Sequence, residues 1–405
     1  MAHPPAPIHT ATGPRIVIAS DKFKGSATAD EVGAALASGI LAVRADATVE
    51  VVPVADGGEG TLDAALAGGF GRRDVTVHGP TGKPLTAAFG LRGDEAFVEM
   101  AAASGLAVLP EGLPAPLTAS SRGTGDLIRA ALDAGARRVV LGVGGSASTD
   151  GGAGMLTALG VRLLDAAGRD LPDGGGALER LDRVDVSGLD PRLPDVDVVL
   201  ASDVENPLLG ARGAAAVFGP QKGASAEGVR RLEVGLHWYA ELLGVALGAA
   251  GTRPADRAGA GAAGGVGFAA LAALRARRRA GADLVMELVG LPARIAGADL
   301  VITGEGSLDE QSLAGKTPMG VLAAGQRAGV AVVAVAGRSL LTPEQVRRAG
   351  FRAVHTLAEL EPDPDRSMRG ATALLRLIGE RIGTGLHDPE GRSRGVVRPV
   401  PAPRA

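Results

Sequence analysis

The stretch that decides the fold is RIVIASDKFKGSATADEVGAALASGIL, which runs from Arg15 to Leu41. Its first part, 15–20, is short, apolar and β-branched, as is typical of a buried strand. Thr28 and Glu31 have the spacing of a capping box, so a helix is predicted to begin there and to continue to Leu41. A polar loop, DKFKGS, joins the two. The stretch is therefore a strand–loop–helix unit, the repeating element of an α/β fold.

The same alternation continues along the chain. Further strands are predicted at 49–55, 137–145, 196–202, 298–304 and 330–337, and each leads into a turn or helix. Thr342, Pro343 and Gly350 mark the start and end of another helix. By contrast, 75–100 has the alternation and glycine-rich turns of β-hairpins, and we expect a domain boundary near it. The pattern predicts an α/β protein with largely parallel sheets.

The composition is that of an ordinary soluble globular protein. A chain of 405 residues favours two domains. Hydrophobic residues make up 46%, charged residues 21%, and the net charge is −3, so there is no basic excess for nucleic acid. Cysteine is absent, which excludes disulfides, thiolate catalysis and thiolate-bound metals. We find no membrane-length apolar run and no signal-peptide core, so we expect a cytoplasmic protein with disordered ends at 1–14 and 388–405.

Lysine is scarce, which draws attention to the lysines that remain. Of 42 basic residues five are lysines, at positions 22, 24, 83, 222 and 316. A lysine is a compact point charge that the planar fork of arginine does not replace. Lys83, in the turn GPTGKP, is the expected bystander. Lys316 stands in LAGKTPMG, which resembles the end of a phosphate-binding P-loop, but Glu310 occupies the place of the required first glycine, so that motif is excluded.

Chemically active residues gather in five loops, each at the end of a predicted strand. Ligands of open α/β sheets bind at the carboxyl ends of strands. The loops are DKFKGS, DGGEG, GGSASTDGGAG, DVENP and EGSLDEQSLAGK. Their candidate site residues are Lys22, Lys24, Asp56, Glu59, Gly144, Gly145, Ser146, Asp150, Asp203, Asn206, Glu305 and Lys316. Lys222, just before a helix predicted to begin at Ser225, joins them because its place suits an anion as well as an ordinary loop.

These residue types are the components of a phosphoryl-transfer site. Glycine-rich turns offer backbone N–H groups to phosphate. Carboxylates together with phosphates hold Mg²⁺, lysine neutralises the transferring group, and a carboxylate accepts the hydroxyl proton. Any single aspartate after a strand could instead be a helix cap. GAGAAGG, 259–265, follows no strand and is interpreted as a packing loop that opens a helix over 266–279. His237, Trp238 and Tyr239 are expected in a core or interface.

The chain resembles the type-1 glycerate kinase family from about Arg15 to Gly385. The resemblance rests on long motifs in the family's order: VPVADGGEGT, EMAAASGL, SRGTGDLI, GGSASTDGGAGM, FGPQKGAS, GAGAAGGVG and VITGEGSLDEQSLAGKTPMGV. One departure is Ser20, where the family often has proline. The resemblance implies a Rossmann-like outer domain, placed here at 15–76 plus 290–385, interrupted by a second α/β domain at 77–289. The active site is expected in the cleft between them.

The resemblance also implies ATP-dependent, Mg²⁺-dependent phosphorylation of D-glycerate to 2-phosphoglycerate in organic-acid and glyoxylate catabolism. We expect Asp56, Asp203, Glu305 and Lys316 to be catalytic, and Asp203 and Glu305 to hold the metal. The other candidates would bind substrate or phosphate. Glycerate and ATP are the expected partners. We expect no nucleic-acid or membrane partner, and the sequence is compatible with a homodimer. The residues leave open a 3-hydroxyl kinase, a kinase for another small hydroxy acid, and a metabolite-binding regulator without catalysis.

Overall fold

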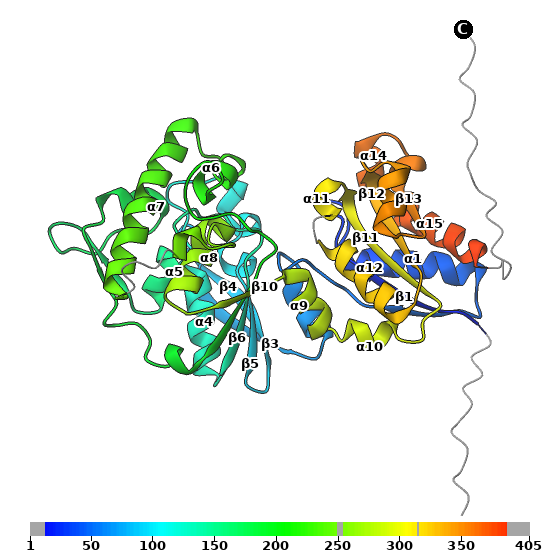
Figure 1. The fold of residues 1–405 in the computed structure, drawn as a ribbon, viewed down its shortest axis with the longest axis horizontal. Coiled ribbons are helices and arrows are strands. Elements are labelled where there is room, and N and C mark those ends of the chain that lie inside the picture. The colour runs from blue at the N-terminus through cyan, green and yellow to red at the C-terminus, as the bar shows by residue number, and fades with distance from the viewer. Residues whose placement is uncertain (1–12, 249–253, 314–315, 387–405) are drawn as a thin grey trace, which may run out of the picture.

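The computed structural model describes residues 13–248, 254–313 and 316–386. Within these ranges the strands form a five-stranded sheet, a six-stranded sheet and a two-stranded ribbon, and helices cover the two larger sheets (Figure 1). The α/β class is therefore confirmed. The disorder predicted for 1–14 and 388–405 concerns residues that, apart from 13 and 14, lie outside the described ranges. No helix of the described part is both long and apolar enough to cross a membrane.

The five-stranded sheet is parallel throughout and has the order β13-β12-β11-β1-β2. Its strands are β1 (Arg15–Ser20), β2 (Thr48–Val51), β11 (Leu300–Leu308), β12 (Val332–Ser339) and β13 (Ala353–Thr356). The strand predicted at 49–55 is shorter than expected because Pro53 has no N–H to donate. The amides of Val52 and Val54 still donate to β1, at 2.8 and 3.3 Å.

Helices cover both faces of this sheet. One face packs against α1 (Ala29–Val43) and α15 (Ala371–Gly385), and the other against α9 (Gly281–Leu288), α10 (Leu291–Ile295) and α12 (Thr317–Ala328). The capping box of α1 forms as predicted, with both Thr28 and Glu31 engaged. Short helices lie in the connections: α11 (Glu310–Leu313), α13 (Pro343–Ala349) and α14 (Pro364–Arg369). Helix α13 begins and ends with the residues predicted from the sequence.

The six-stranded sheet is mixed, in the order β10-β9-β6-β5-β4-β3. Strands β3 (Gly71–His78), β4 (Pro84–Arg92) and β5 (Glu95–Glu99) are antiparallel neighbours, which confirms the predicted hairpins. Strands β6 (Arg138–Gly142), β9 (Asp197–Ala201) and β10 (Arg277–Arg279) continue from β5 in parallel. A separate ribbon pairs β7 (Arg162–Leu164) with β8 (Arg183–Asp185).

One predicted helix is too long. The helix expected over 266–279 corresponds to α8 (Ala262–Ala272), which already ends at Ala272. Arg275 then takes a positive φ of 53°, which an α-helix cannot accommodate. The residues that follow become β10 and pair with β9. Arginine-rich sequence is a good helix former, so tertiary pairing overrides local propensity here.

The core of the six-stranded part is apolar. It packs under α3 (Ala101–Ser104), α4 (Arg122–Asp133), α5 (Ala153–Ala158), α6 (Ala214–Phe218), α7 (Ala226–Ala246) and α8. Tyr239 is fully buried in it and meets Phe268 edge to face, 5.8 Å between ring centroids. Trp238, its neighbour on α7, is 51% exposed. The core role expected for Tyr239 is confirmed.

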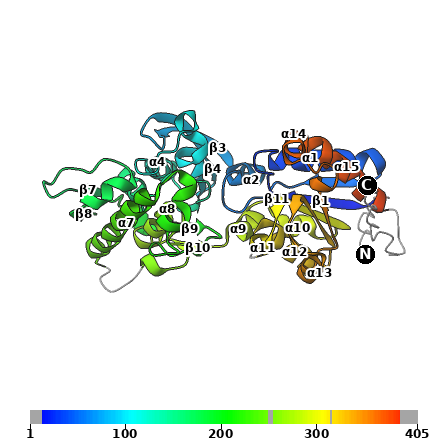
Figure 2. The same ribbon diagram turned by 90° about the horizontal axis from the view of Figure 1, so that it is seen from above.

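Two helices lie between the sheets (Figure 2): α2 (Thr61–Ala67) and α9. Leu62 of α2 and Leu284 of α9 pack against the six-stranded sheet, whereas Ala64 and Val285 on the same helices pack with the five-stranded part. Strand β3 lies wholly in the six-stranded sheet and crosses the boundary expected at residue 76. The division into an outer and an inserted domain stays a prediction.

Candidate active site

A pocket of about 720 Å³ opens at the carboxyl ends of the five-stranded sheet. The helix after β1 covers one face of this sheet and the helix after β11 covers the other, although the two strands are neighbours. Such a reversal leaves a crevice at the strand ends, where α/β proteins bind ligands. The loops after β1, β2, β11, β12 and β13 line the pocket, and Gly144 and Gly145 after β6 close it from the other sheet.

The loops of the two sheets touch at glycines. A Cβ on Gly144 would lie 2.2 Å from the Cα of Gly58, so no side chain fits between these two loops. Likewise, a Cβ on Gly281, at the start of α9, would lie 2.2 Å from the carbonyl oxygen of Asp56. The glycines of DGGEG and of GGSASTDGGAG therefore bring residues from both halves of the chain to one pocket.

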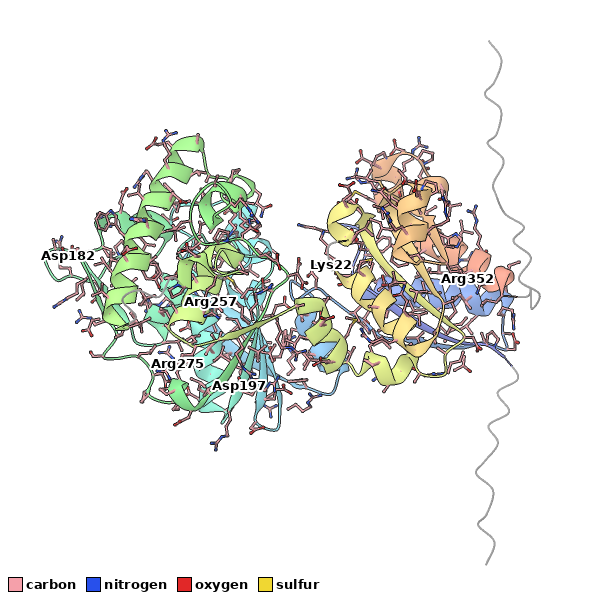
Figure 3. The ribbon with its side chains drawn as sticks, in the orientation of Figure 1. Lys22, Asp182, Asp197, Arg257, Arg275 and Arg352 are labelled. Carbon is pink, nitrogen blue, oxygen red and sulfur yellow. The ribbon has the colours of Figure 1, made fainter. Side chains whose placement is uncertain are left out.

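The pocket collects most of the residues singled out from the sequence. Its walls include Lys22, Lys24, Asp56, Glu59, Gly144, Gly145, Glu305 and Lys316. Ser146, Asp150, Asp203, Asn206 and Lys222 do not line it. Four charged residues on its walls were not among the predicted site residues: Asp21, Asp309, Arg338 and Glu361. Lys22 projects from the side of the five-stranded part that faces the other half of the molecule (Figure 3).

Four carboxylates share the region around Asp56. Burial, followed by the negative charge of Asp56, raises the pKa of Asp21 to about 7. One oxygen of Asp21, Oδ1, accepts a hydrogen bond from the amide of Lys22 at 2.7 Å, which opposes this rise. Asp203 and Glu305 also feel the charge of Asp56. Carboxylates placed close enough to repel one another are typical of functional sites, such as a cation or phosphate site.

Asp203 and Glu305 each keep one buried oxygen without a hydrogen-bond partner. Oδ1 of Asp203 accepts from the amide of Gly281 at 2.8 Å, but Oδ2 has no partner. Burial raises the pKa of Asp203 to about 6. Oε1 of Glu305 is similarly unpaired, and burial raises its pKa, while the positive charge of Lys316 acts in the opposite direction. An unpaired buried oxygen is costly, so both point to a ligand that supplies positive charge or a proton.

These two oxygens suit a magnesium ion that arrives with a nucleotide. Among the described residues, no group of three or more His, Cys, Asp or Glu side chains is arranged as a complete metal cage. Mg²⁺ in phosphoryl-transfer sites takes one or two carboxylates and completes its shell with phosphate oxygens and water. The donor set of Asp203 and Glu305 fits that pattern.

The lysines of the pocket differ in their surroundings. Nζ of Lys22 donates to the backbone oxygen of Glu59 at 2.6 Å and to its Oε2 at 2.9 Å. Lys24 is exposed on the pocket wall. Lys316 occupies the N-cap position of α12, where the helix dipole adds positive potential. Helix α11 separates it from β11, a connection that a P-loop does not have.

Lys222 does not face the pocket, although the sequence placed it at an anion site. It is 3% exposed, and its Nζ donates to Oγ of Ser146 at 2.7 Å and to the backbone oxygen of Ser148 at 2.5 Å. Burial lowers its pKa to about 7. Lys222 therefore holds the loop whose first residues, Gly144 and Gly145, reach the pocket.

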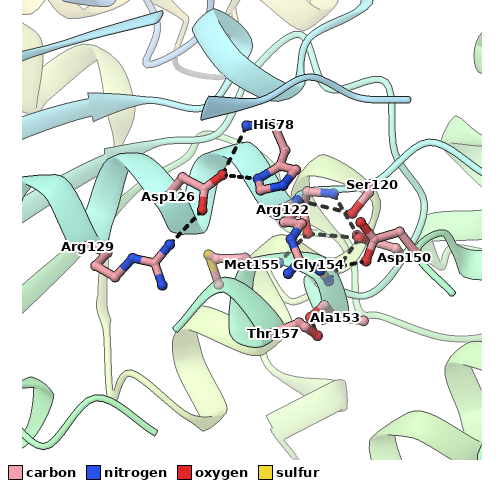
Figure 4. A network of polar contacts seen from close by, with 12 residues as sticks. His78, Ser120, Arg122, Asp126, Arg129, Asp150, Ala153, Gly154, Met155 and Thr157 are labelled. Atoms are coloured by element: carbon pink, nitrogen blue, oxygen red, sulfur yellow. Dashed lines mark hydrogen bonds and ion pairs between the residues drawn. The ribbon is translucent and has the colours of Figure 1, made fainter. Parts of the chain in front are cut away.

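Asp150 and Asn206 also hold their own loops. Asp150 is fully buried, and Oδ2 accepts hydrogen bonds from the amide and hydroxyl of Ser121, both at 2.8 Å, and from the amide of Gly154 at 3.2 Å (Figure 4). Burial raises its pKa against these bonds. The side-chain amide of Asn206 donates to the backbone oxygen of Arg212 at 2.8 Å. Neither side chain lines the pocket.

Comparison with known proteins identifies relatives along nearly the whole chain. The model of the Glycerate kinase family matches residues 16–387. A glycerate kinase of Bacillus subtilis (strain 168) is 46% identical over 346 residues, which cover 85% of this chain and 90% of the relative. A glycerate 2-kinase of Escherichia coli (strain K12) is 44% identical over 360 residues, which cover 88% and 94%.

The fold also has a counterpart among solved structures. A crystal structure described as a candidate glycerate kinase 2, from Salmonella typhimurium LT2, is similar with a TM-score of 0.77 and 43% identity. The similarity covers 92% of this chain and 98% of that one. The arrangement of the two larger sheets is therefore shared with a protein of closely related sequence.

Proposed function

The chain belongs to the glycerate kinase family, and from this premise we propose that it transfers the γ-phosphoryl group of ATP to the 2-hydroxyl of D-glycerate. The glycerate 2-kinase name of the Escherichia coli relative supports the 2-position. The observation that carries the proposal is the pocket itself, where Lys22, Lys24 and Lys316 line the same walls as Asp56, Glu59 and Glu305, and Glu305 keeps one buried oxygen without a hydrogen-bond partner. We further propose a cytoplasmic role in organic-acid and glyoxylate catabolism.

The size of the pocket suits two substrates. Its volume of about 720 Å³ is in the range that holds a drug-sized ligand. Glycerate, a three-carbon acid, fills only a small part of it, and the remainder has room for a nucleotide. Loops from both sheets enclose the place where the two would meet, which favours transfer between them over loss of phosphate to water.

Charged groups of the pocket, together with Asp203, which interacts electrostatically with Asp56 of the pocket wall, have roles in this transfer. Lys316, at the start of α12, stabilises the negative charge that spreads over the moving phosphoryl oxygens. Lys22 and Lys24 bind the glycerate carboxylate or the phosphates. Asp203 and Glu305 would hold Mg²⁺, which when bound neutralises the phosphates. Asp21 accepts the proton of the substrate hydroxyl, because a pKa close to neutral suits a general base.

This assignment predicts how activity depends on pH. The folded pKa of Asp21 is raised to about 7, so Asp21 becomes a carboxylate that can accept a proton only as the pH rises through that value. We expect kcat/KM to fall on the acidic side of about pH 7 in steady-state assays between pH 5 and 9. Asp21→Asn should lower kcat/KM across this whole pH range and remove the acidic limb, because the base itself is lost. A flat wild-type profile down to pH 5, with the enzyme still folded, would rule out Asp21 as the base.

The buried lysine should act on the reaction from a distance. Lys222→Met removes the donor to Ser146 and Ser148, and we expect kcat/KM to fall by roughly 10- to 100-fold because the glycine loop is no longer fixed. Ser146→Ala, which breaks only one of the two bonds, should give part of that loss. Circular dichroism and thermal melts would verify that both variants fold. Wild-type kinetics in a folded Lys222→Met variant would show that the loop needs no such support.

A substrate panel tests the proposed function. ADP release would be followed with D-glycerate, L-glycerate, lactate and tartronate as acceptors, each with Mg²⁺ and again with excess EDTA. The proposal requires a clear preference for D-glycerate and loss of activity in EDTA. A higher kcat/KM for another hydroxy acid would establish the alternative acceptor. Tight D-glycerate binding without ADP release would instead support the regulator.

A further inference from the structure

One end of the pocket is apolar and has no part in the chemistry described so far. This apolar arm consists of Phe23, Leu357, Ala358, Pro362, Pro364 and Met368. All but Phe23 come from the segment after β13, which contains the 3₁₀ helix η7 (Leu357–Glu359) and α14. We propose that the apolar arm binds the base of the nucleotide, with the phosphates directed from it toward Lys316. This inference rests on the proposed function.

The order of the strands places the arm at a defined distance from the charged groups. The loops after β13, β12, β11 and β1 follow one another along the sheet edge. The arm lies beyond β13, Arg338 ends β12, and Glu305 and Lys316 belong to the connection after β11. From β13 to β11 is two strand spacings, about 10 Å. A nucleotide laid along this edge has its base in the arm, its phosphates past Arg338 and its γ-phosphate near Lys316.

The apolar arm includes side chains that are fixed in the buried core. Phe23 and Leu357 are each 2% exposed and belong to the same buried cluster. Met368 is 45% exposed, and its Cε would lie 3.2 Å from a Cβ on Gly25, so it extends over the loop after β1. A flexible methionine at the rim of an apolar pocket can close over a flat ring. It is an exposed side chain that a bound base would cover.

The chemistry of the two substrates decides between them. Glycerate carries a carboxylate and two hydroxyls and has almost no apolar surface, so walls of proline, leucine and methionine offer it nothing. A nucleobase has two flat faces that gain from such walls. Glu361 also lines this end and accepts a hydrogen bond from the amide of Asp363 at 3.0 Å, which fixes a carboxylate where ribose hydroxyls would pass.

Binding measurements with matched ligands test this. Isothermal titration calorimetry would measure the non-hydrolysable ATP analogue AMP-PNP and inorganic tripolyphosphate, which has the phosphates without base or ribose. Ala358→Phe fills the arm, and Met368→Ala removes its rim. We expect Ala358→Phe to weaken the affinity for AMP-PNP at least about tenfold, and Met368→Ala to weaken it several-fold. The affinity for tripolyphosphate should change less than about twofold in both variants. Leu377→Ala, on the exposed side of α15 and outside the pocket, is the control and should change neither.

The outcomes distinguish a failure of the base-binding proposal from a failure of the proposed function. Unchanged AMP-PNP affinity in both arm variants overturns the proposal, and so does an equal loss of tripolyphosphate affinity, which would put phosphates in the arm. Because glycerate is absent, base binding in the arm by a protein that does not phosphorylate glycerate contradicts the proposed function alone. A glycerate kinase whose arm variants keep the wild-type KM for ATP contradicts the arm alone. Thermal melts would confirm folding, and Met368, being half exposed, is the safer of the two positions.

Discussion

Asp203→Asn is expected to lower kcat about 10³-fold while the protein stays folded. Asparagine keeps the oxygen that accepts the hydrogen bond from Gly281 at 2.8 Å, so the start of α9 should be undisturbed. It removes the negative charge that Asp203 carries near Asp56 at neutral pH, and with it a proposed ligand of Mg²⁺. Steady-state kinetics at saturating glycerate and ATP would measure the loss, and raising the Mg²⁺ concentration should recover part of it.

Asp197→Asn is the matched control for this variant. Asp197 and Asp203 flank the same strand, β9, but Asp197 lies at its opposite end and pairs with Arg277 at 2.7 Å, away from the pocket. A partly exposed ion pair of this kind contributes at most about 1 kcal/mol. We expect wild-type kinetics from it. If the kcat of Asp203→Asn stays within about threefold of the kcat of Asp197→Asn, then Asp203 takes no part in the reaction.

Lys316→Met should have an effect of similar size, about 10³-fold on kcat. Methionine matches the length of lysine, so the change removes charge with little loss of volume. The loss should fall mainly on kcat, because the charge on the phosphoryl group spreads over its oxygens in the transition state. Lys316→Arg should restore little, since the broad guanidinium cannot take the place of a compact ammonium at the helix start.

Lys83→Met provides the comparison for Lys316. Lys83 is exposed in the turn between β3 and β4 and does not line the pocket. Both variants lose one positive charge, so any effect of net charge on solubility or on long-range attraction of ATP is the same in each. We expect Lys83→Met to be active and Lys316→Met to be nearly inactive. Equal activities would remove Lys316 from the site.

Much of the fold follows from local signals. The strand and helix of 15–41, the capping box at Thr28 and the hairpins after residue 75 all form as the sequence predicts, because period, caps and glycine turns are local properties. The arginine-rich end of 266–279 is the exception. There the pairing of β10 with β9 decides, and that neighbour is distant in sequence.

The site was predictable as a set of loops but not as a set of roles. The strand-end rule brings Asp56, Glu305 and Lys316 to one pocket. The rule does not say which way a side chain points, so Asp150 and Lys222 look like ligand-binding residues in the sequence. In the structure they instead form hydrogen bonds to backbone and hydroxyl groups of nearby loops. Asp21 was visible as the first residue after β1. Its raised pKa depends on burial and then on the charge of Asp56, and only the fold supplies both.

The apolar arm could not be found from the sequence. All of its residues except Phe23 lie in a segment after β13 that has none of the motifs singled out in the sequence, and only the order of strands places that segment next to Arg338 and the loop after β1. The scarcity of aromatic residues, with one tryptophan and one tyrosine, indicated that any nucleobase would meet aliphatic walls. The place of those walls is a property of the folded chain.

The most direct test of the central claim is ³¹P NMR of the purified protein with D-glycerate, ATP and Mg²⁺, followed over time and repeated with EDTA. We expect a new resonance of 2-phosphoglycerate that grows as the γ-phosphate of ATP declines, and no such resonance in EDTA. A resonance of 3-phosphoglycerate would contradict the assignment of the 2-hydroxyl. Intact ATP and no phosphorylated product, from folded protein, would contradict the proposal that this pocket phosphorylates glycerate.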